Sequence, residues 1–226
     1  MESIISLQQQ PVTTKFIDKL IETPNTYEAW SKRLLDLIVA SGALILLAPI
    51  FLFAALAIRL DSPGPLFFHQ TRVGYRGKLF TMLKFRSMYT DAEARQQALL
   101  SHNEMDCGKL FKMKNDPRIT RVGRWLRRLS IDELPQLINV LRGDMTLVGP
   151  RPALPKEVAL YSASDAERLR AVPGITCLWQ VSGRSDLPFE QQVLLDKRYI
   201  ATLSLKTDLT ILLRTVPAVL SGRGAY

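Results

Sequence analysis

One uncharged segment constrains the fold of this chain more than any other feature. Residues 37–58, LIVASGALILLAPIFLFAALAI, form a run of 22 positions without a charged side chain. At 1.5 Å per residue, a straight helix of this length reaches about 33 Å, which is enough to cross the apolar core of a bilayer. A soluble core helix is seldom apolar on every face. The segment therefore predicts a helix that enters a membrane.

The path of this helix depends on Pro49, near its middle. A proline removes one backbone donor and clashes with the preceding turn, so we expect a kink or break at residues 47–49. Lys32 and Arg33 precede the segment, and several Lys and Arg residues follow it. Since such residues mark cytoplasmic ends, two basic flanks favour a helix–break–helix hairpin that returns to the cytoplasmic face. A proline-kinked spanning helix is the alternative.

The composition narrows the classes of partner. The chain has 30 Lys and Arg against 21 Asp and Glu, a formal net charge of +9. This surplus indicates a polyanionic partner: nucleic acid, an anionic membrane surface or a phosphorylated substrate. Cys107 and Cys177 form no CxxC pair, which indicates cytosolic thiols. His69 and His102 have no neighbouring Cys or second His, which argues against a zinc site and a Ser-His-Asp triad.

Three parts are predicted along the chain. Residues 1–30 are polar and lack the apolar core of a signal peptide, so we expect a flexible lead-in. Residues 31–60 contain the membrane hairpin. Residues 61–226 form a domain at the cytoplasmic face, in which Gly74 and Gly77 bracket the turn of a short β-hairpin. The predicted fold class is α+β and helix-dominated, with amphipathic helices lying in the membrane interface.

Two neighbouring segments of this domain predict helices. Arginines recur every three residues in RITRVGRWLRR, so several can lie on one side of a helix, which is either a binding surface or a solvated face. An apolar stripe at helical spacing follows, and it ends at Gly143, a common helix terminator. Its members are Leu134, Leu137, Ile138 and Leu141. TLVGPRPALP, which comes next, is predicted to be a loop.

The stretch LRRLSIDELPQL, residues 126–137, has an ordinary structural interpretation. Ser130 is a favoured N-cap, and Glu133 three residues later would complete a capping box. Acidic side chains suit the positive end of a helix dipole, and Pro135 is tolerated in a first turn. On local physics alone, this is the start of a helix.

The same residues also suit chemistry on phosphate. Arg127 and Arg128 lie directly upstream, and guanidinium groups bind phosphate oxygens in pairs. An ionised Asp132 beside them is a plausible nucleophile toward phosphorus once the negative charge of the substrate is masked. Glu133 could hold Mg²⁺, which prefers carboxylate and phosphate oxygens. The residues alone leave both interpretations open.

Four longer motifs give this sequence a family resemblance. They are KRLLDLIVASGALILLAPIFL at 32–52, PLFFHQTRVGYRGKLFTMLKFRSM at 65–88, LRRLSIDELPQLINVLRGDMTLVGPRP at 126–152 and VPGITCLWQVSGR at 172–184. The chain from about residue 32 onward resembles the monotopic phosphoglycosyl transferases, the bacterial sugar transferases that begin glycan assembly. Within that family it looks most like the undecaprenyl-phosphate galactose phosphotransferases of exopolysaccharide synthesis.

The resemblance implies an Mg²⁺-dependent enzyme. It would transfer a hexose-1-phosphate from a UDP-sugar to undecaprenyl phosphate and release UMP. Galactose is the expected sugar and glucose the alternative. The nucleophile of the family falls on Asp132, which would form a covalent phosphosugar intermediate, and its metal-supporting carboxylate falls on Glu133. The basic positions that contact substrate phosphate fall on Arg127, Arg151, Arg184 and Lys84.

The resemblance also implies a location and a shape for the membrane segment. The family has a re-entrant helix at the cytoplasmic face of the inner membrane, broken at a Ser-Pro pair. Here the pair is Ala48-Pro49, so the serine hydroxyl is absent. We expect inner-membrane lipid as a partner, no nucleic acid, and a homodimer as a reasonable assembly. Two other functions compete: a membrane-tethered nucleic-acid binder, and a non-catalytic scaffold for glycan assembly.

Overall fold

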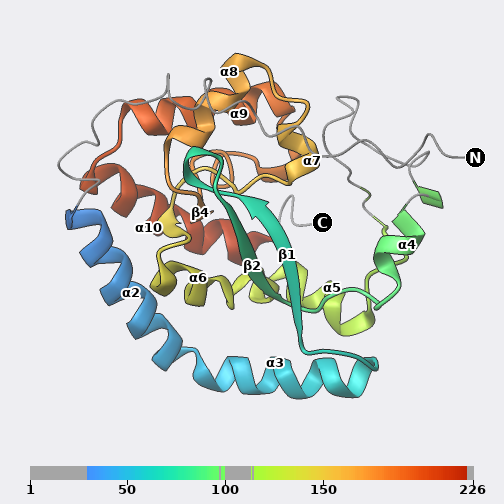
Figure 1. Cartoon of the computed structure of the whole chain (residues 1–226). Helices are drawn as coiled ribbons and strands as arrows, with labels where there is room; N and C mark the ends of the chain where they lie inside the picture. The colour runs from blue at the N-terminus through green and yellow to red at the C-terminus, as the bar shows by residue number, and fades with distance from the viewer. Residues whose placement is uncertain (1–29, 97, 100–112, 114, 223–226) are drawn as a thin grey trace, which may run out of the picture.

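The computed structural model describes residues 30–96, 98–99, 113 and 115–222, and it has the expected helix-dominated α+β fold (Figure 1). The predicted lead-in, His102 and Cys107 lie outside these residues, apart from Trp30. The α-helices are α2 (Lys32–Leu46), α3 (Ala48–Asp61), α4 (Ala92–Gln96), α5 (Arg121–Arg128), α6 (Gln136–Arg142), α7 (Pro155–Val158), α8 (Ala163–Ala166), α9 (Phe189–Ala201) and α10 (Leu205–Ser221). The strands are β1 (Phe67–Val73), β2 (Leu79–Phe85), β3 (Thr146–Val148) and β4 (Gly174–Thr176).

The predicted break in the apolar segment is confirmed. Helices α2 and α3 meet at Leu47 with a bend of 59°. Pro49 lies in the first turn of α3, where its missing N–H costs no hydrogen bond because the first N–H groups of any helix have no partner within it. Within the described residues no single helix is long and apolar enough to cross a membrane, although the bent pair meets that criterion by length and composition together.

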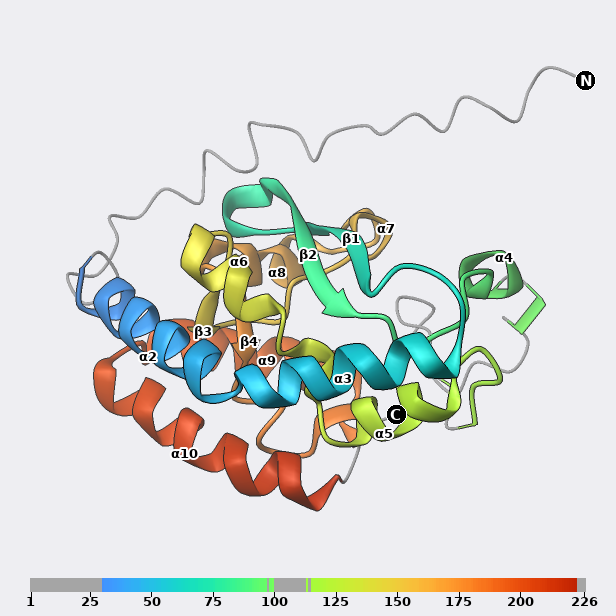
Figure 2. The same ribbon diagram turned by 90° about the horizontal axis from the view of Figure 1, so that it is seen from below.

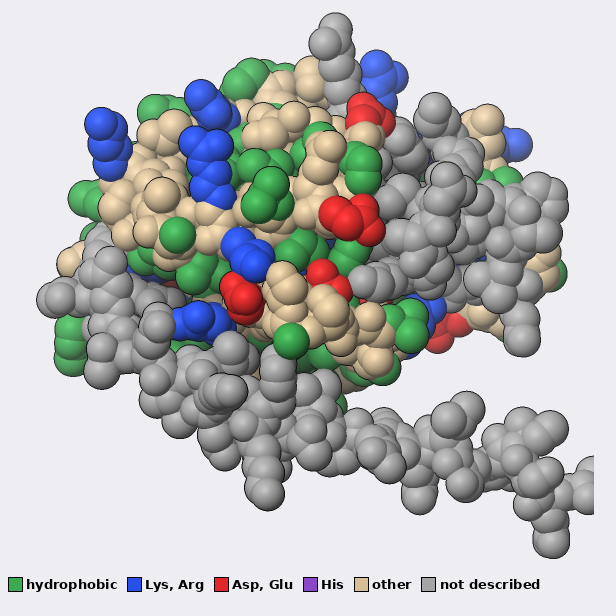
Figure 3. Space-filling view, turned by 90° about the horizontal axis from the view of Figure 1, so that it is seen from above, with side chains coloured by type: hydrophobic (Ala, Val, Ile, Leu, Met, Phe, Trp, Pro, Cys, Tyr) green, Lys and Arg blue, Asp and Glu red, His purple; other side chains and the backbone are tan. Residues whose placement is uncertain are grey.

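Helices α2, α3, α5 and α10 lie on the same side of the molecule (Figure 2). This side exposes many large apolar side chains: Leu34, Ile38, Ile45, Leu46, Leu52, Phe53, Leu56 and Leu60 from α2 and α3, Trp125 from α5, and Leu209, Leu213, Val216 and Leu220 from α10. We call this surface the apolar face. The opposite side carries acidic and basic side chains interspersed with hydrophobic ones (Figure 3). A continuous apolar surface on a folded chain marks a site of protein or membrane interaction.

The β-hairpin is also confirmed. Strands β1 and β2 pair antiparallel from Phe67 opposite Phe85 to Val73 opposite Leu79. The turn between them places Arg76 at φ 52° and Gly77 at φ 79°, and the glycine adopts this left-handed conformation without steric cost. Beyond the hairpin, the N–H of Val73 donates to the carbonyl of Ala153 at 2.9 Å.

A second sheet lies where a loop was predicted. Strand β3, inside TLVGPRPALP, pairs in parallel with β4, and Thr146 lies opposite Gly174. The two chains approach so closely beyond this pair that a Cβ atom on Gly174 would lie 2.1 Å from the backbone nitrogen of Gly149. A side chain at residue 174 is therefore excluded, and the loop after β3 packs directly on β4.

The hydrophobic core joins both sheets to the helices. Its largest cluster consists of Ala40, Met82, Leu137, Val140, Met145, Leu147, Val148, Tyr199, Leu203 and Ile211. A second cluster, formed by Ala54, Ile58, Phe85 and Leu126, packs α3 against β2 and α5. The apolar segment is thus part of the core on one side and exposed on the other.

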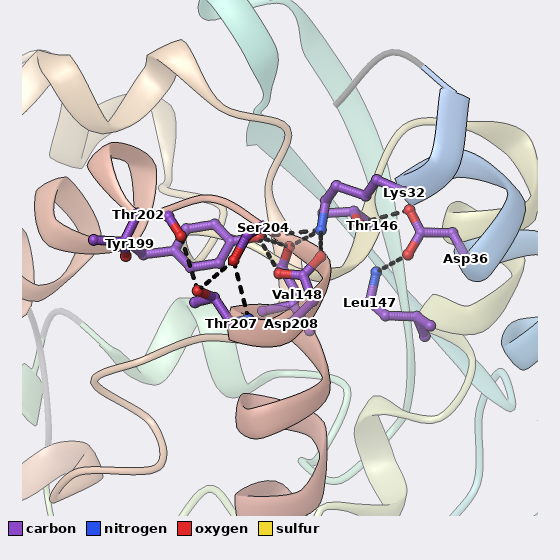
Figure 4. Close-up of polar contacts among 10 residues, drawn as sticks. All are labelled: Lys32, Asp36, Thr146, Leu147, Val148, Tyr199, Thr202, Ser204, Thr207 and Asp208. Carbon is purple, nitrogen blue, oxygen red and sulfur yellow. Dashed lines mark hydrogen bonds and ion pairs between the residues drawn. The ribbon is translucent and has the colours of Figure 1, made fainter. Parts of the chain in front are cut away.

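A buried polar network holds the start of α2 (Figure 4). The ammonium of Lys32 lies 2.6 Å from Asp208 Oδ2 and donates to the carbonyl of Val148 at 2.8 Å. The hydroxyl of Tyr199 lies 2.8 Å from that same carbonyl and 2.8 Å from Asp208 Oδ1. One turn further along α2, Asp36 accepts from the N–H of Leu147 at 2.9 Å. The network therefore joins α2, β3, α9 and α10.

This network corrects one part of the charge argument. Lys32 and Arg33 were treated as a basic flank of the membrane segment, but Lys32 is buried in an ion pair. Arg33 donates to the carbonyls of Val140 and Leu141, at the end of α6. Both cations belong to the fold, so they say little about the side on which the helix begins.

We predict that Lys32→Met destabilises the protein by about 3–5 kcal/mol, because it removes the ammonium that neutralises the buried carboxylate of Asp208. Adding Asp208→Asn removes the charge of that carboxylate and keeps the contact with Tyr199, so the double variant should recover much of the loss. Chemical denaturation of the two variants and the native chain measures both effects. Equal stability of the single and double variants would contradict this account of the network.

Candidate active site

Asp132 lies on a strained turn between α5 and α6. Helix α5 runs from Arg121 to Arg128 and is capped by Thr120, whose hydroxyl accepts from the N–H of Gly123 at 2.9 Å. Ser130 then adopts φ 54° and ψ 22°, and residues 131–133 form a 3₁₀ turn. A left-handed backbone costs a non-glycine residue about 1–3 kcal/mol and persists only where the surrounding structure imposes it. Such strain directly before a buried acid is typical of functional sites.

The capping-box interpretation of this stretch is wrong. The side chain of Ser130 makes no capping hydrogen bond, and α6 begins only at Gln136. The carboxylate of Glu133 instead accepts from the ammonium of Lys84 at 2.7 Å. Leu134, which the apolar stripe places on the helix, precedes α6 because this helix begins only at Gln136. The Ser-x-x-Glu motif is therefore no capping box here, because the carboxylate of Glu133 binds Lys84 rather than the backbone at Ser130.

The two adjacent carboxyl groups have opposite electrostatic environments. Burial raises the pKa of Asp132, and the charge of Glu133 adds to that rise, while Lys84 and Arg127 oppose it. Burial also acts on Glu133, but the charges of Lys84, Arg151 and Arg127 outweigh it and hold the pKa of that carboxyl below its usual range. Neighbouring acids whose pKa values are pushed apart are characteristic of catalytic pairs. The raised pKa of Asp132 runs against the expectation of a readily ionised aspartate at this position.

The four predicted phosphate-binding cations surround this pair. Lys84 comes from β2, Arg127 from α5, Arg151 from the loop after β3, and Arg184 from the 3₁₀ turn at Arg184–Asp186. Arg127 and Arg151 act electrostatically on Glu133. Burial lowers the pKa of Arg184, and the negative charge of Glu133 opposes that shift. The structure therefore brings together cations that lie up to a hundred residues apart in the sequence.

The other arginines of the predicted basic segments have different roles. Arg118 lies before α5 and pairs with Asp116. Arg121, Arg124 and Arg128 are exposed. Arg86, next to the KF dipeptide of β2, donates to the carbonyls of residues 62 and 63 and so ties the end of α3 to the hairpin. Within the basic segment at residues 118–128, it is the charge of Arg127 that acts on both acids.

A small cleft opens beside Glu133. The cleft is partly open to solvent, and its volume of about 30 Å³ exceeds the roughly 10–15 Å³ that one water molecule requires, so it has room for a small polar group. Its walls are Arg72, Met82, Lys84, Glu133, Gln136, Arg151, Pro152, Gly174, Ile175 and Gln180. The charged members suit a phosphate group.

Sequence reasoning missed three polar residues of this cleft: Arg72, Gln136 and Gln180. Arg72 donates to the carbonyl of Pro152 at 2.9 Å and so supports the loop that carries Arg151. Burial and the charge of Arg151 lower the pKa of Arg72 to about 9, so its guanidinium stays protonated at neutral pH. An arginine within a predicted strand is the signal that could have identified Arg72. The carbonyl that it binds lies 80 residues further along the chain, so the sequence alone does not show this contact.

The acidic residues suit a magnesium site that is completed by phosphate groups of the substrate. Within the described ranges, no group of three His, Cys, Asp or Glu residues is arranged to hold a metal. Mg²⁺ is commonly bound by one or two carboxylates together with substrate phosphates and waters. Lys84 contacts Oε1 of Glu133, which leaves Oε2 for a cation. Glu133, which lines the cleft, therefore matches this donor set.

Comparison with known proteins places the chain in a family. Residues 27–222 match the model of the bacterial sugar transferase family. Exopolysaccharide production protein ExoY of Sinorhizobium fredii is 41% identical over 199 residues, which is 87% of this chain and 88% of that protein. The UDP-glucose:undecaprenyl-phosphate glucose-1-phosphate transferase of Caulobacter vibrioides is 45% identical over 86% of this chain and 72% of its own length.

A third relative is longer. The undecaprenyl-phosphate galactose phosphotransferase of Salmonella typhimurium is 42% identical over 198 residues, which is 86% of this chain but only 41% of that protein. The chain thus spans less than half the length of this relative. These matches, on top of the clustered acids and cations, show that the chain is a transferase of the bacterial sugar transferase family.

Proposed function

We propose that the protein transfers a hexose-1-phosphate from a UDP-sugar to undecaprenyl phosphate and releases UMP, as the first membrane step of exopolysaccharide synthesis. The observation that carries this proposal is the buried Asp132 next to Glu133, inside a cluster of cations. The names of the relatives support it and include both galactose and glucose enzymes. We propose UDP-galactose as the donor, with UDP-glucose as the second candidate.

The reaction needs a nucleophile and a means of masking negative charge. The carboxylate of Asp132 attacks the phosphorus that bears the sugar, and the bond from that phosphorus to the oxygen of the UMP phosphate breaks. A phosphate oxygen of undecaprenyl phosphate then attacks the same phosphorus, which frees the carboxylate and forms the lipid diphosphate sugar. Lys84, Arg127, Arg151 and Arg184 reduce the repulsion between this anionic nucleophile and the anionic substrates.

Magnesium completes the proposed donor site. Glu133, beside Asp132, would hold the ion, which when bound neutralises charge on the donor diphosphate. The chain itself positions the ligands: Lys84 orients Glu133 through a 2.7 Å ion pair, and the strained turn at Ser130 directs Asp132 inward.

The apolar face suits a location at the cytoplasmic side of the bacterial inner membrane. We propose that α2 and α3 form a re-entrant hairpin, with α5 and α10 lying in the interface. Phe53 of α3 contacts Trp125 of α5 with ring centroids 6.2 Å apart, and indole rings favour the interface. Since Asp132 follows α5 closely, this arrangement brings the acid near the depth of a lipid phosphate.

The break in the hairpin does not need the serine of the family's Ser-Pro pair. The carbonyl of Leu47 accepts from the N–H of Phe51 at 3.0 Å, and the N–H of Leu47 donates to the carbonyl of Ala43 at 2.8 Å. Both backbone groups of Leu47, the residue at the bend, are therefore paired although Ala48 stands in the serine position. A homodimer remains a prediction for this chain.

The proposed reaction predicts UMP release by the purified, detergent-solubilised protein given Mg²⁺, undecaprenyl phosphate and UDP-galactose or UDP-glucose. Asp132→Asn keeps the shape of the side chain but removes the nucleophile, so the rate should fall at least about 10³-fold. Asp91→Asn, which changes an exposed acid outside the cleft, is the matched control and should retain activity.

A donor panel separates the alternatives. Release from one UDP-sugar that is lost in Asp132→Asn supports the proposal and identifies the sugar. A folded protein that releases UMP from no member of a broad UDP-sugar panel favours the scaffold function. Salt-dependent binding to any DNA duplex would instead favour the nucleic-acid function.

The environment of Asp132 predicts a pH dependence. The attacking carboxyl must be ionised, and its pKa is raised, so kcat/KM should fall on acidification at a pH above the usual range of aspartate. Lys84→Met removes a charge that opposes this rise and should move the acidic limb to higher pH, besides lowering the rate. Lys84→Arg keeps the charge and should keep the limb in place. A limb at the same pH in Lys84→Met would contradict the assignment.

The hairpin proposal predicts that both of its ends lie on the cytoplasmic side. Single cysteines at Trp30 and Pro63, with Cys107 replaced by serine and the buried Cys177 retained, should react with a membrane-impermeant maleimide in inverted vesicles but not in intact spheroplasts. Lys78→Cys on the soluble domain marks the cytoplasmic side. Reaction of residues 30 and 63 from opposite sides would instead show a spanning helix.

A further inference from the structure

Gln180 is a neutral side chain on a cleft whose other polar walls are mostly charged. It follows β4 in a turn, and it lines the cleft together with Arg72, Lys84 and Arg151. Trp179, next to it, is buried and fixes this turn in the core. A carboxamide at such a position can either donate or accept, because its oxygen and nitrogen ends have nearly the same shape. Whether the oxygen or the nitrogen of the Gln180 carboxamide faces a ligand therefore depends on which of the two atoms is hydrogen-bonded to the protein.

Cys177 holds that other end. The residue is fully buried, and its Sγ lies 3.1 Å from Oε1 of Gln180. Burial raises the pKa of this thiol well above its ordinary value, so it keeps its proton. The backbone N–H groups of Gln180 and Trp179 donate toward the sulfur. In the contact with Gln180 the thiol is the donor and Oε1 the acceptor.

This contact decides the polarity that Gln180 presents. With Oε1 bound to the thiol, the Nε2 amine is the end left for the cleft. A reversed amide would place its amine against the thiol and its oxygen toward the cleft. Because Arg72, Lys84 and Arg151 line the same space, the ligand is expected to be rich in anionic oxygens, which a carbonyl oxygen would repel and an amine would bind.

We propose that Gln180 is a substrate-binding residue that donates from Nε2 to an oxygen of the sugar-phosphate donor, and that Cys177 is a positioning residue that sets the orientation of this amide. The inference rests on the proposed function and adds to it a contact with the donor. It assigns the buried thiol a role that depends on its proton, and the thiol takes no part in the chemistry.

The test compares Cys177→Ala with Cys177→Ser in the full-length protein. Alanine removes the hydrogen bond, so the KM for the UDP-sugar should rise about fivefold, the ratio expected for losing one hydrogen bond. Serine keeps a donor and should restore KM to within about twofold. In both variants kcat and the KM for undecaprenyl phosphate should change little, because the thiol acts through the orientation of Gln180 alone.

A second pair of variants removes the dependence on Cys177. Gln180→Glu has the same shape but replaces the donating amine with an anionic oxygen, so the KM for the UDP-sugar should rise at least about tenfold. Gln191→Glu adds the same charge at an exposed position of α9 and is the control. Thermal melting of every variant establishes that the comparisons are made on folded protein.

The outcomes separate the inference from the proposed function. Equal donor KM values for the native chain, Cys177→Ala and Gln180→Glu overturn the inference while the proposed function stands. A serine variant as impaired as the alanine variant overturns the positioning role. If the native protein releases no UMP from any UDP-sugar, the proposed function fails, and calorimetric titration with UMP tests the same ranking of variants. Absence of UMP binding by the native chain overturns both.

Discussion

The buried contact of Lys32 with Asp208 and the carbonyl of Val148 is the interaction on which the remaining structure depends. It places the first turn of the apolar hairpin against β3, and Tyr199 reinforces it from α9. Val148 lies three residues before Arg151, so α2 holds the strand that leads into the loop with this predicted phosphate-binding residue. An ion pair with both partners buried gains little stability over apolar packing, but it loses much when one partner is removed. Its main effect here is to fix one arrangement of helix and strand.

Electrostatic asymmetry is the second organising feature. Asp132 and Glu133 are adjacent in sequence, yet Asp132 is buried and its pKa is raised, while Glu133 is paired with Lys84 and its pKa is lowered. The lowered pKa of the paired acid suits the proposed role of Glu133 as a metal ligand, and the raised pKa of the buried acid makes Asp132 the stronger base, which suits its proposed role as nucleophile. The turn at Ser130 makes this separation possible, because a regular helix would leave both carboxyl groups on its exposed first turn.

Local signals in the sequence predicted the features that depend on nearby residues. Pro49 predicted the break, Gly74 and Gly77 the β-hairpin turn, and Gly143 the end of α6, since each acts on its own backbone. The errors concern distant partners. The capping box failed because Glu133 pairs with a lysine 49 residues away. Lys32 seemed a free charge because Asp208 lies 176 residues along the chain. Strand β3 seemed a loop because three residues carry too little pattern to show a parallel partner.

The close approach of Gly149 and Gly174 has a consequence for engineering. One wall of the cleft is main chain, joined by the bond from the N–H of Gly174 to the carbonyl of Pro150 at 2.9 Å. Any side chain at residue 174 would collide with that backbone, so residue 174 is unsuitable for mutagenesis that aims to reshape the cleft. Under the proposed function, donor preference is therefore to be altered at the surrounding side chains, and Gln136 and Ile175 are uncharged wall positions at which a change leaves the cations in place. Variants with a different donor preference are therefore to be sought among these side chains, because the main-chain wall of the cleft is fixed.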